Sequence, residues 1–200
     1  MKITSHVRLI LAAGSFAVGG LLHASPVYFN ATLSGPAEGN ASPGTGQAWV
    51  TYDPSAHTLQ VNATFTGLTG TTTASHIHAA TAVPGAGTAG VATQVPNFPG
   101  FPLGVTSGTY QSATFDLTLL GSWNPAFVTA HGGTAAGAED FFAAALWSGS
   151  SYFNIHTSTF GGGEIRGFLH VPDAAQSASL LLLGLASLIG LSRIRLLGTR

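Results

Sequence analysis

The sequence predicts an all-β fold: one antiparallel β-sandwich with one short helix. Two observations favour it. Apolar and polar residues alternate with a period of two in several short segments, and clusters of Gly, Pro and Thr separate those segments. Cysteine is absent, so no disulfide or thiolate metal site is possible and the fold depends on an apolar core and backbone pairing.

The strands are expected where the alternation is clearest. In "HTLQVNATFTG" (57–67), Leu59, Val61, Ala63 and Phe65 alternate with polar residues, which indicates a strand with one buried face. "GTYQSATFDLTLL" (108–120) repeats the pattern. Asp53-Pro54-Ser55 is typical of a hairpin turn. Further strands are predicted at 27–35, 45–53, 74–80, 151–157 and 163–171.

Two segments depart from the strand pattern. "AGAEDFFAAALWSG" carries consecutive alanines and places Phe142 and Leu146 four residues apart, which predicts a short helix from Glu139 to Trp147. Its two acids, Glu139 and Asp140, suit a helix N-terminus better than an acid/base pair. Residues 79–108 are rich in Gly, Pro and Thr, and predict a long loop with one short strand near 91–95.

Both ends of the chain are typical of processing signals. Lys2 and Arg8 precede an apolar stretch and small residues follow it, which predicts a secretory signal peptide over residues 1–24. Residues 172–200 contain an apolar run, 178–191, followed by arginines, which predicts a transmembrane segment with a cytoplasmic C-terminus. The folded domain is therefore expected to span residues 25–171, in the periplasm, on the outer cell surface or outside the cell.

The charge balance excludes one class of partner. Between Pro26 and Val171 the only basic residue is Arg166, against six acidic residues, a formal charge of −5. Because such a surface repels a phosphate backbone, nucleic-acid binding is not expected.

Several motifs occur in an order that resembles the CHRD (chordin) domain. They are Leu33-Ser34-Gly35, Gly67-Leu68-Thr69-Gly70, His76-Ile77-His78, Asn154-Ile155-His156-Thr157 and Gly163-Glu164-Ile165-Arg166-Gly167. The resemblance covers about Val27 to Leu169 and implies a surface or extracellular-matrix binding role, with a protein or polysaccharide ligand, and no reaction. The tail, which begins Val171-Pro172-Asp173, is similar to a PEP-CTERM sorting signal. That similarity implies an exosortase-type processing enzyme.

The histidines raise a separate question about chemistry. His76 and His78 share one face of a strand, and the alternation of "SYFNIHT" places His156 and Asn154 on its polar face. If the strands are neighbours, Glu164 and Arg166 join the same patch. One interpretation is a structural network of Glu164, Arg166 and Asn154, in which the acid pairs with the arginine. The other is a zinc or copper site of His76, His78, His156 and Glu164.

The metal interpretation leaves an enzymatic alternative open. Superoxide dismutases are also β-sandwiches with a His-x-His strand, so the fold could be immunoglobulin-like or superoxide dismutase-like. A copper–zinc pair, however, needs six histidines and an aspartate. A hydrolase is not expected, because the sequence has no Gly-x-Ser-x-Gly elbow.

Overall fold

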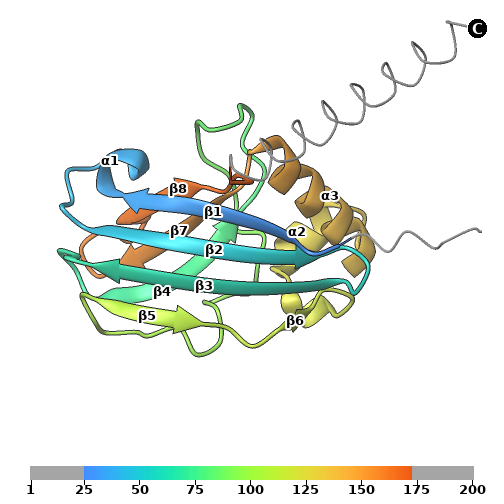
Figure 1. The fold of residues 1–200 in the computed structure, drawn as a ribbon, viewed down its shortest axis with the longest axis horizontal. Helices are drawn as coiled ribbons and strands as arrows, with labels where there is room; N and C mark the ends of the chain where they lie inside the picture. The colour runs from blue at the N-terminus through green and yellow to red at the C-terminus, as the bar shows by residue number, and fades with distance from the viewer. Residues whose placement is uncertain (1–24, 173–200) are drawn as a thin grey trace, which may run out of the picture.

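The structure, a computed structural model, describes residues 25–172 and is mostly β, with a few short helices (Figure 1). Eight strands form the framework. They are β1 (Val27–Ser34), β2 (Thr45–Asp53), β3 (Thr58–Thr66), β4 (Thr72–His78), β5 (Gly108–Gln111), β6 (Phe115–Asp116), β7 (Tyr152–Thr157) and β8 (Ile165–Phe168).

All eight strands belong to one antiparallel sheet. Its order is β4-β7-β8-β1-β2-β3-β5, and β6 also pairs with β3. Figure 1 shows that this sheet curls, which lets it surround its own core. The predicted antiparallel all-β class is confirmed. Where two stacked sheets were predicted, however, the structure has a single curled one, because the strand pairing continues without a break from β4 to β5.

The period-two alternation gives the sheet one apolar face. Phe29, Leu33, Val61, Ile77 and Ile155 are each at most 1% exposed on this inner face. Their neighbours along each strand point to the outer face, as strand geometry requires. The turn between β2 and β3 is the predicted one: the Asp53 carboxylate accepts hydrogen bonds from the N–H groups of Ser55 and Ala56.

The segment 108–120 is more broken than its alternation predicted. Instead of one strand it forms β5 and β6, joined through Ser112, whose hydroxyl accepts the Val61 N–H. After β6, the Asp116 carboxylate accepts hydrogen bonds from the N–H and hydroxyl of Thr118, and the chain turns. Leu119 is therefore 58% exposed, although the pattern predicted that it would be buried.

Within residues 25–172 the structure has three α-helices and one 3₁₀ turn, where one helix was predicted. They are α1 (Gly35–Glu38), η1 (Leu120–Ser122), α2 (Pro125–Ala130) and α3 (Ala135–Ser148). The helix predicted over 139–147 lies within α3. That helix begins earlier because Thr134 caps it, accepting the Gly137 N–H. Figure 1 shows α2 and α3 at one end of the sheet and α1 at the other.

Residues 79–107 follow the open edge of β4. Backbone hydrogen bonds join Ala92 N to Ile77 O, Phe98 N to Ser75 O and Thr72 N to Val105 O. The predicted strand near 91–95 is reduced to isolated bridges, one of which pairs Val91 with His78. This segment therefore covers an edge that would otherwise expose unpaired backbone groups, and it reaches the histidines of β4.

The predicted signal peptide and the apolar C-terminal run lie outside the described residues. Within residues 25–172, no helix has the length and apolar character needed to cross a membrane.

Candidate metal centre

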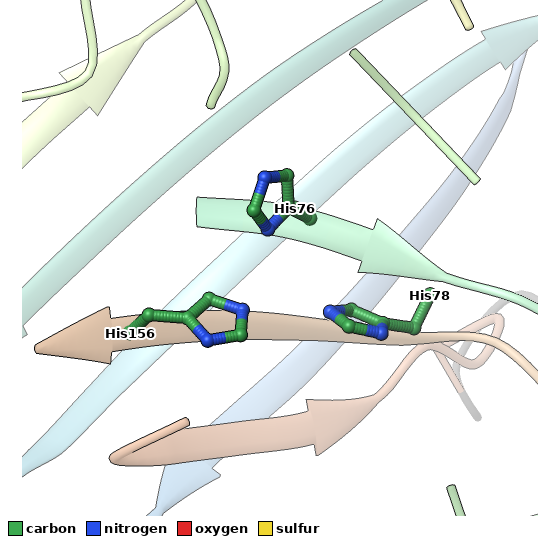
Figure 2. A group of neighbouring side chains, drawn as sticks. All are labelled: His76, His78 and His156. Carbon is green, nitrogen blue, oxygen red and sulfur yellow. The ribbon is translucent and has the colours of Figure 1, made fainter. Parts of the chain in front are cut away.

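Two neighbouring strands bring His76, His78 and His156 together. β4 carries the first two on one face and pairs with β7, in the register His78 with Tyr152, His76 with Asn154 and Ala74 with His156. The three ring centroids lie 5.1 to 5.9 Å apart. Figure 2 shows the rings turned toward one another. We call these three residues the histidine cluster.

Each ring of the histidine cluster is held by one backbone carbonyl. His76 Nε2 lies 2.7 Å from Pro96 O, His78 Nδ1 lies 2.9 Å from Ala89 O, and His156 Nδ1 lies 3.0 Å from Gly161 O. A carbonyl oxygen can only accept, so each of these nitrogens carries the hydrogen. In a neutral imidazole the other nitrogen then has a free lone pair.

Those other nitrogens are buried and have no hydrogen-bond partner. They are Nδ1 of His76 and Nε2 of His78 and of His156. Among the described residues, the histidine cluster is the one group of three or more metal-ligating side chains whose ligand atoms, one from each residue, all lie within 4.8 Å of one another. Each of the three rings therefore has one buried acceptor nitrogen, and the rings themselves, each held by a backbone carbonyl, meet at one place. The arrangement matches that of metal-bound histidines, which donate their second nitrogen to an outer partner.

Burial keeps the three imidazoles neutral. His76 and His78 are only 6% and 7% exposed, and this burial lowers the pKa of each from 6.5 to about 4. Burial also lowers the pKa of His156. At neutral pH the lone pairs are therefore available for a ligand.

Glu164, a predicted fourth ligand, lies in a different network. Its carboxylate accepts hydrogen bonds from the Ser42 and Thr157 hydroxyls and from the N–H groups of Thr69 and Gly70. Burial raises the pKa of Glu164, but these four hydrogen bonds together outweigh it and hold the pKa below its usual value. Both oxygens are engaged, so the carboxylate joins three segments and is not part of the histidine cluster.

The predicted ion pair between Glu164 and Arg166 is not formed. Arg166 Nε donates to Ala37 O at 2.6 Å and lies 3.3 Å from Glu38 Oε2. Glu164 precedes β8 and lies in a bend after Gly163, whose φ is 135°. The alternation of side chains along a strand therefore does not apply to Glu164, and it does not place this side chain beside that of Arg166. The Asn154 amide packs against this glycine, 2.5 Å from where a Cβ would stand. Asn154 is opposite Arg166 in the β7–β8 register, but its amide oxygen is buried without a hydrogen-bond partner, so the predicted network of Glu164, Arg166 and Asn154 is not formed.

Tyr152 is a residue of the site that the sequence did not single out. Its ring stacks on His78 at a centroid distance of 4.8 Å, and the Arg166 guanidinium lies 4.8 Å from the same ring. Because β7 lies between β4 and β8, Tyr152 stands between the cluster and the arginine. The Arg166 charge still contributes, after burial, to the lowered pKa of His78. No sequence signal could have identified the carbonyls of Ala89 and Pro96.

The remaining histidines of the described chain are engaged elsewhere. His57 Nδ1 lies 2.9 Å from Glu139 Oε2, and Tyr52 donates to Glu139 Oε1 at 3.0 Å, so this acid is a buried link between α3 and the β2–β3 hairpin. His131 stacks on Phe141, and His170 is exposed after β8.

A family model, the CHRD domain, matches the chain over residues 29–169. The matched span runs from β1 to just beyond β8 and includes the histidine cluster. No curated protein matches the chain, and no solved structure matches it.

Proposed function

The chain belongs to the CHRD domain family, and we propose that its domain binds one zinc or copper ion between His76, His78 and His156. The role is that of a non-catalytic metal-binding domain of an exported protein. It extends the binding role that the family resemblance implies, by assigning a ligand to one face of the sheet.

One observation carries the proposal: three buried acceptor nitrogens face one another without a donor. A water molecule has two hydrogens and can donate to two of the three nitrogens at once. A metal ion accepts all three lone pairs together. Because a buried polar atom without a partner costs free energy, a cation is the species that best satisfies this cluster.

The chemistry of the ligands favours zinc or copper. Neutral imidazoles suit both ions, whereas calcium and magnesium prefer oxygen. Zinc binds imidazole nitrogen at about 2.0 to 2.1 Å. One nitrogen of each ring lies within 4.8 Å of the other two, so binding requires the rings to move closer together. The formal charge of −5 between Pro26 and Val171 favours the binding of a cation. The Glu38 carboxylate, 3.3 Å from Arg166 Nε, offsets part of the positive charge of the arginine.

A copper–zinc superoxide dismutase would need a second metal site, and none is present in the part of the chain that the structure describes. His57 is bound to Glu139, and no group of three ligands other than the histidine cluster is present among those residues. A binuclear copper–zinc centre therefore has no support there. A superoxide dismutation assay of the copper-loaded protein tests the alternative directly: activity that is lost in His78→Ala would favour an oxidoreductase over a non-catalytic role.

Calorimetric titration of the metal-free protein with zinc and with copper tests the proposal. We expect one ion per chain for at least one of the metals. His78→Ala should abolish this binding, because it removes one of three ligands, whereas the control His170→Ala changes an exposed histidine outside the cluster and should leave it intact. Equal loss in both variants, or no stoichiometric binding by the native chain, would contradict the proposal.

Export and anchoring form the second part of the proposal and rest on the two chain ends. A signal peptide over residues 1–24 and a PEP-CTERM-type tail over residues 172–200 would deliver the domain to the cell surface, with an exosortase-type enzyme acting near Val171-Pro172-Asp173. Mass spectrometry of the native protein should find both segments removed. An intact chain ending in Gly198-Thr199-Arg200 would refute processing of the tail.

A further inference from the structure

The outer face of β1, β2 and β3 is a surface that the histidine cluster does not use. Cross-strand register aligns its side chains in two rows. One row is Thr32, Gln47 and Thr64, and the other is Asn30, Trp49 and Asn62. We call these six residues the polar sheet face. Side chains that are directly opposite on one face of a sheet lie about 4.5 to 5.5 Å apart, so the rows are continuous.

The polar sheet face carries no charge. Its members have hydroxyl, amide or indole groups, all of which can make hydrogen bonds while neutral. Along this register two carboxylates, Asp53 of β2 and Asp116 of β6, pair with Thr58 at one end of the strands, and each accepts hydrogen bonds within its own turn. A charged partner therefore finds no complementary group here, whereas a neutral partner rich in hydroxyls finds both donors and acceptors.

Two aromatic rings stand exposed on this side of the sheet. Trp49 is 44% exposed and Tyr28, two residues before Asn30 on β1, is 64% exposed. Because Asn30 is directly opposite Trp49, Tyr28 is a diagonal neighbour of the tryptophan, at about 7 to 8 Å. An exposed aromatic ring with a polar edge offers a flat apolar surface beside hydrogen-bonding groups. Sugar rings match this, with C–H groups on their faces and hydroxyls at their edges.

A shallow groove of about 660 Å³ continues the surface toward β5. Its lining includes Thr32, Gln47, Thr64 and Thr109, which lie in one row across four strands. Gln47 Nε2 donates to the Thr32 hydroxyl at 3.1 Å, and the hydroxyls of Thr66 and Ser107 lie 3.2 Å apart at the groove's edge. These contacts hold the polar groups in place before any ligand arrives, which lowers the entropic cost of binding.

We propose that the polar sheet face, with Tyr28 and the adjoining groove, binds a neutral polysaccharide. The aromatic rings contact the faces of the sugar rings, and the amides and hydroxyls bond to the sugar hydroxyls. The proposal is independent of the metal site, which lies on β4 and β7 and is separated from this surface by β8.

Affinity electrophoresis of the full chain in gels that contain dextran, glucomannan or galactomannan tests the proposal, with alginate as the anionic comparison. We expect at least one neutral polysaccharide to retard the protein, and alginate not to. Trp49→Ala should weaken this binding at least tenfold. The matched control Trp147→Ala removes another exposed tryptophan, from α3, and should bind like the native chain.

Three results would overturn the proposal: no retardation by any of the neutral polysaccharides, retardation by alginate alone, or equal weakening by Trp49→Ala and Trp147→Ala. Dimerisation that depends on Trp49 in gel filtration would assign the face to a second copy of the chain. His78→Ala should retain polysaccharide binding while losing the metal, so the two proposals can fail separately.

Discussion

Replacing Glu164 by Ala should lower the free energy of unfolding by about 3 to 5 kcal/mol, the largest effect that we expect from one substitution. The change leaves four donors without their acceptor: the hydroxyls of Ser42 and Thr157 and the N–H groups of Thr69 and Gly70. Because the carboxylate is fully buried, water does not readily replace it. Urea unfolding followed by circular dichroism measures the change.

Two further variants make this result specific to the Glu164 carboxylate. Glu164→Gln keeps the size of the side chain but turns an amide N–H₂ group toward donors, so it should also destabilise the fold, by less than Ala does. Asp140→Ala removes an exposed carboxylate from α3 and should change stability little. Native stability in Glu164→Ala would show that the network does not support the fold.

The metal-free protein should lose stability as the pH falls from about 6.5 to about 4. In the unfolded chain His76 and His78 have a pKa near 6.5, whereas in the fold burial lowers each pKa to about 4. Between these values the unfolded state binds protons that the folded state does not, so acid favours unfolding. The loss is at most about 3 kcal/mol for each histidine.

Urea unfolding at several pH values, with a chelator present, measures this dependence. A His76→Gln/His78→Gln variant cannot take up these protons, so its stability should fall less than that of the native chain over the same range. His170→Ala, which changes an exposed histidine, should follow the native curve. Parallel curves for the native chain and the double variant would contradict the buried, neutral state of the cluster.

The sequence predicted the strands best where alternation and turn chemistry agree. β2 has the predicted bounds, and Asp53 forms the turn that follows it, because each strand of this hairpin has one face in the core. The segment 108–120 also alternates, yet it breaks into β5 and β6. There the Ser112 hydroxyl and the Asp116 carboxylate accept hydrogen bonds from backbone N–H groups. Such side-chain hydrogen bonds compete with the pairing of strands, and a pattern of apolar residues does not predict them.

The alternation of side chains between the two faces of a strand was a good guide to the positions of the histidines and a poor one to that of Glu164. His156 lies on a regular strand that pairs with β4, so this alternation places its side chain on the same face of the sheet as that of His76. Glu164 lies in a bend after Gly163, at a φ of 135°, where the alternation of a strand no longer applies. The carbonyls of Ala89 and Pro96, which orient two of the rings, come from a loop without periodicity. They could be found only from the fold.

X-ray absorption spectroscopy of the protein loaded with one equivalent of the metal that binds tests the central claim most directly. It measures the number and distance of the ligand atoms around the ion. We predict three imidazole nitrogens at about 2.0 to 2.1 Å for zinc, with water in the remaining position. A shell of oxygen ligands only, or a spectrum unchanged in His78→Ala, would contradict a metal ion held by His76, His78 and His156.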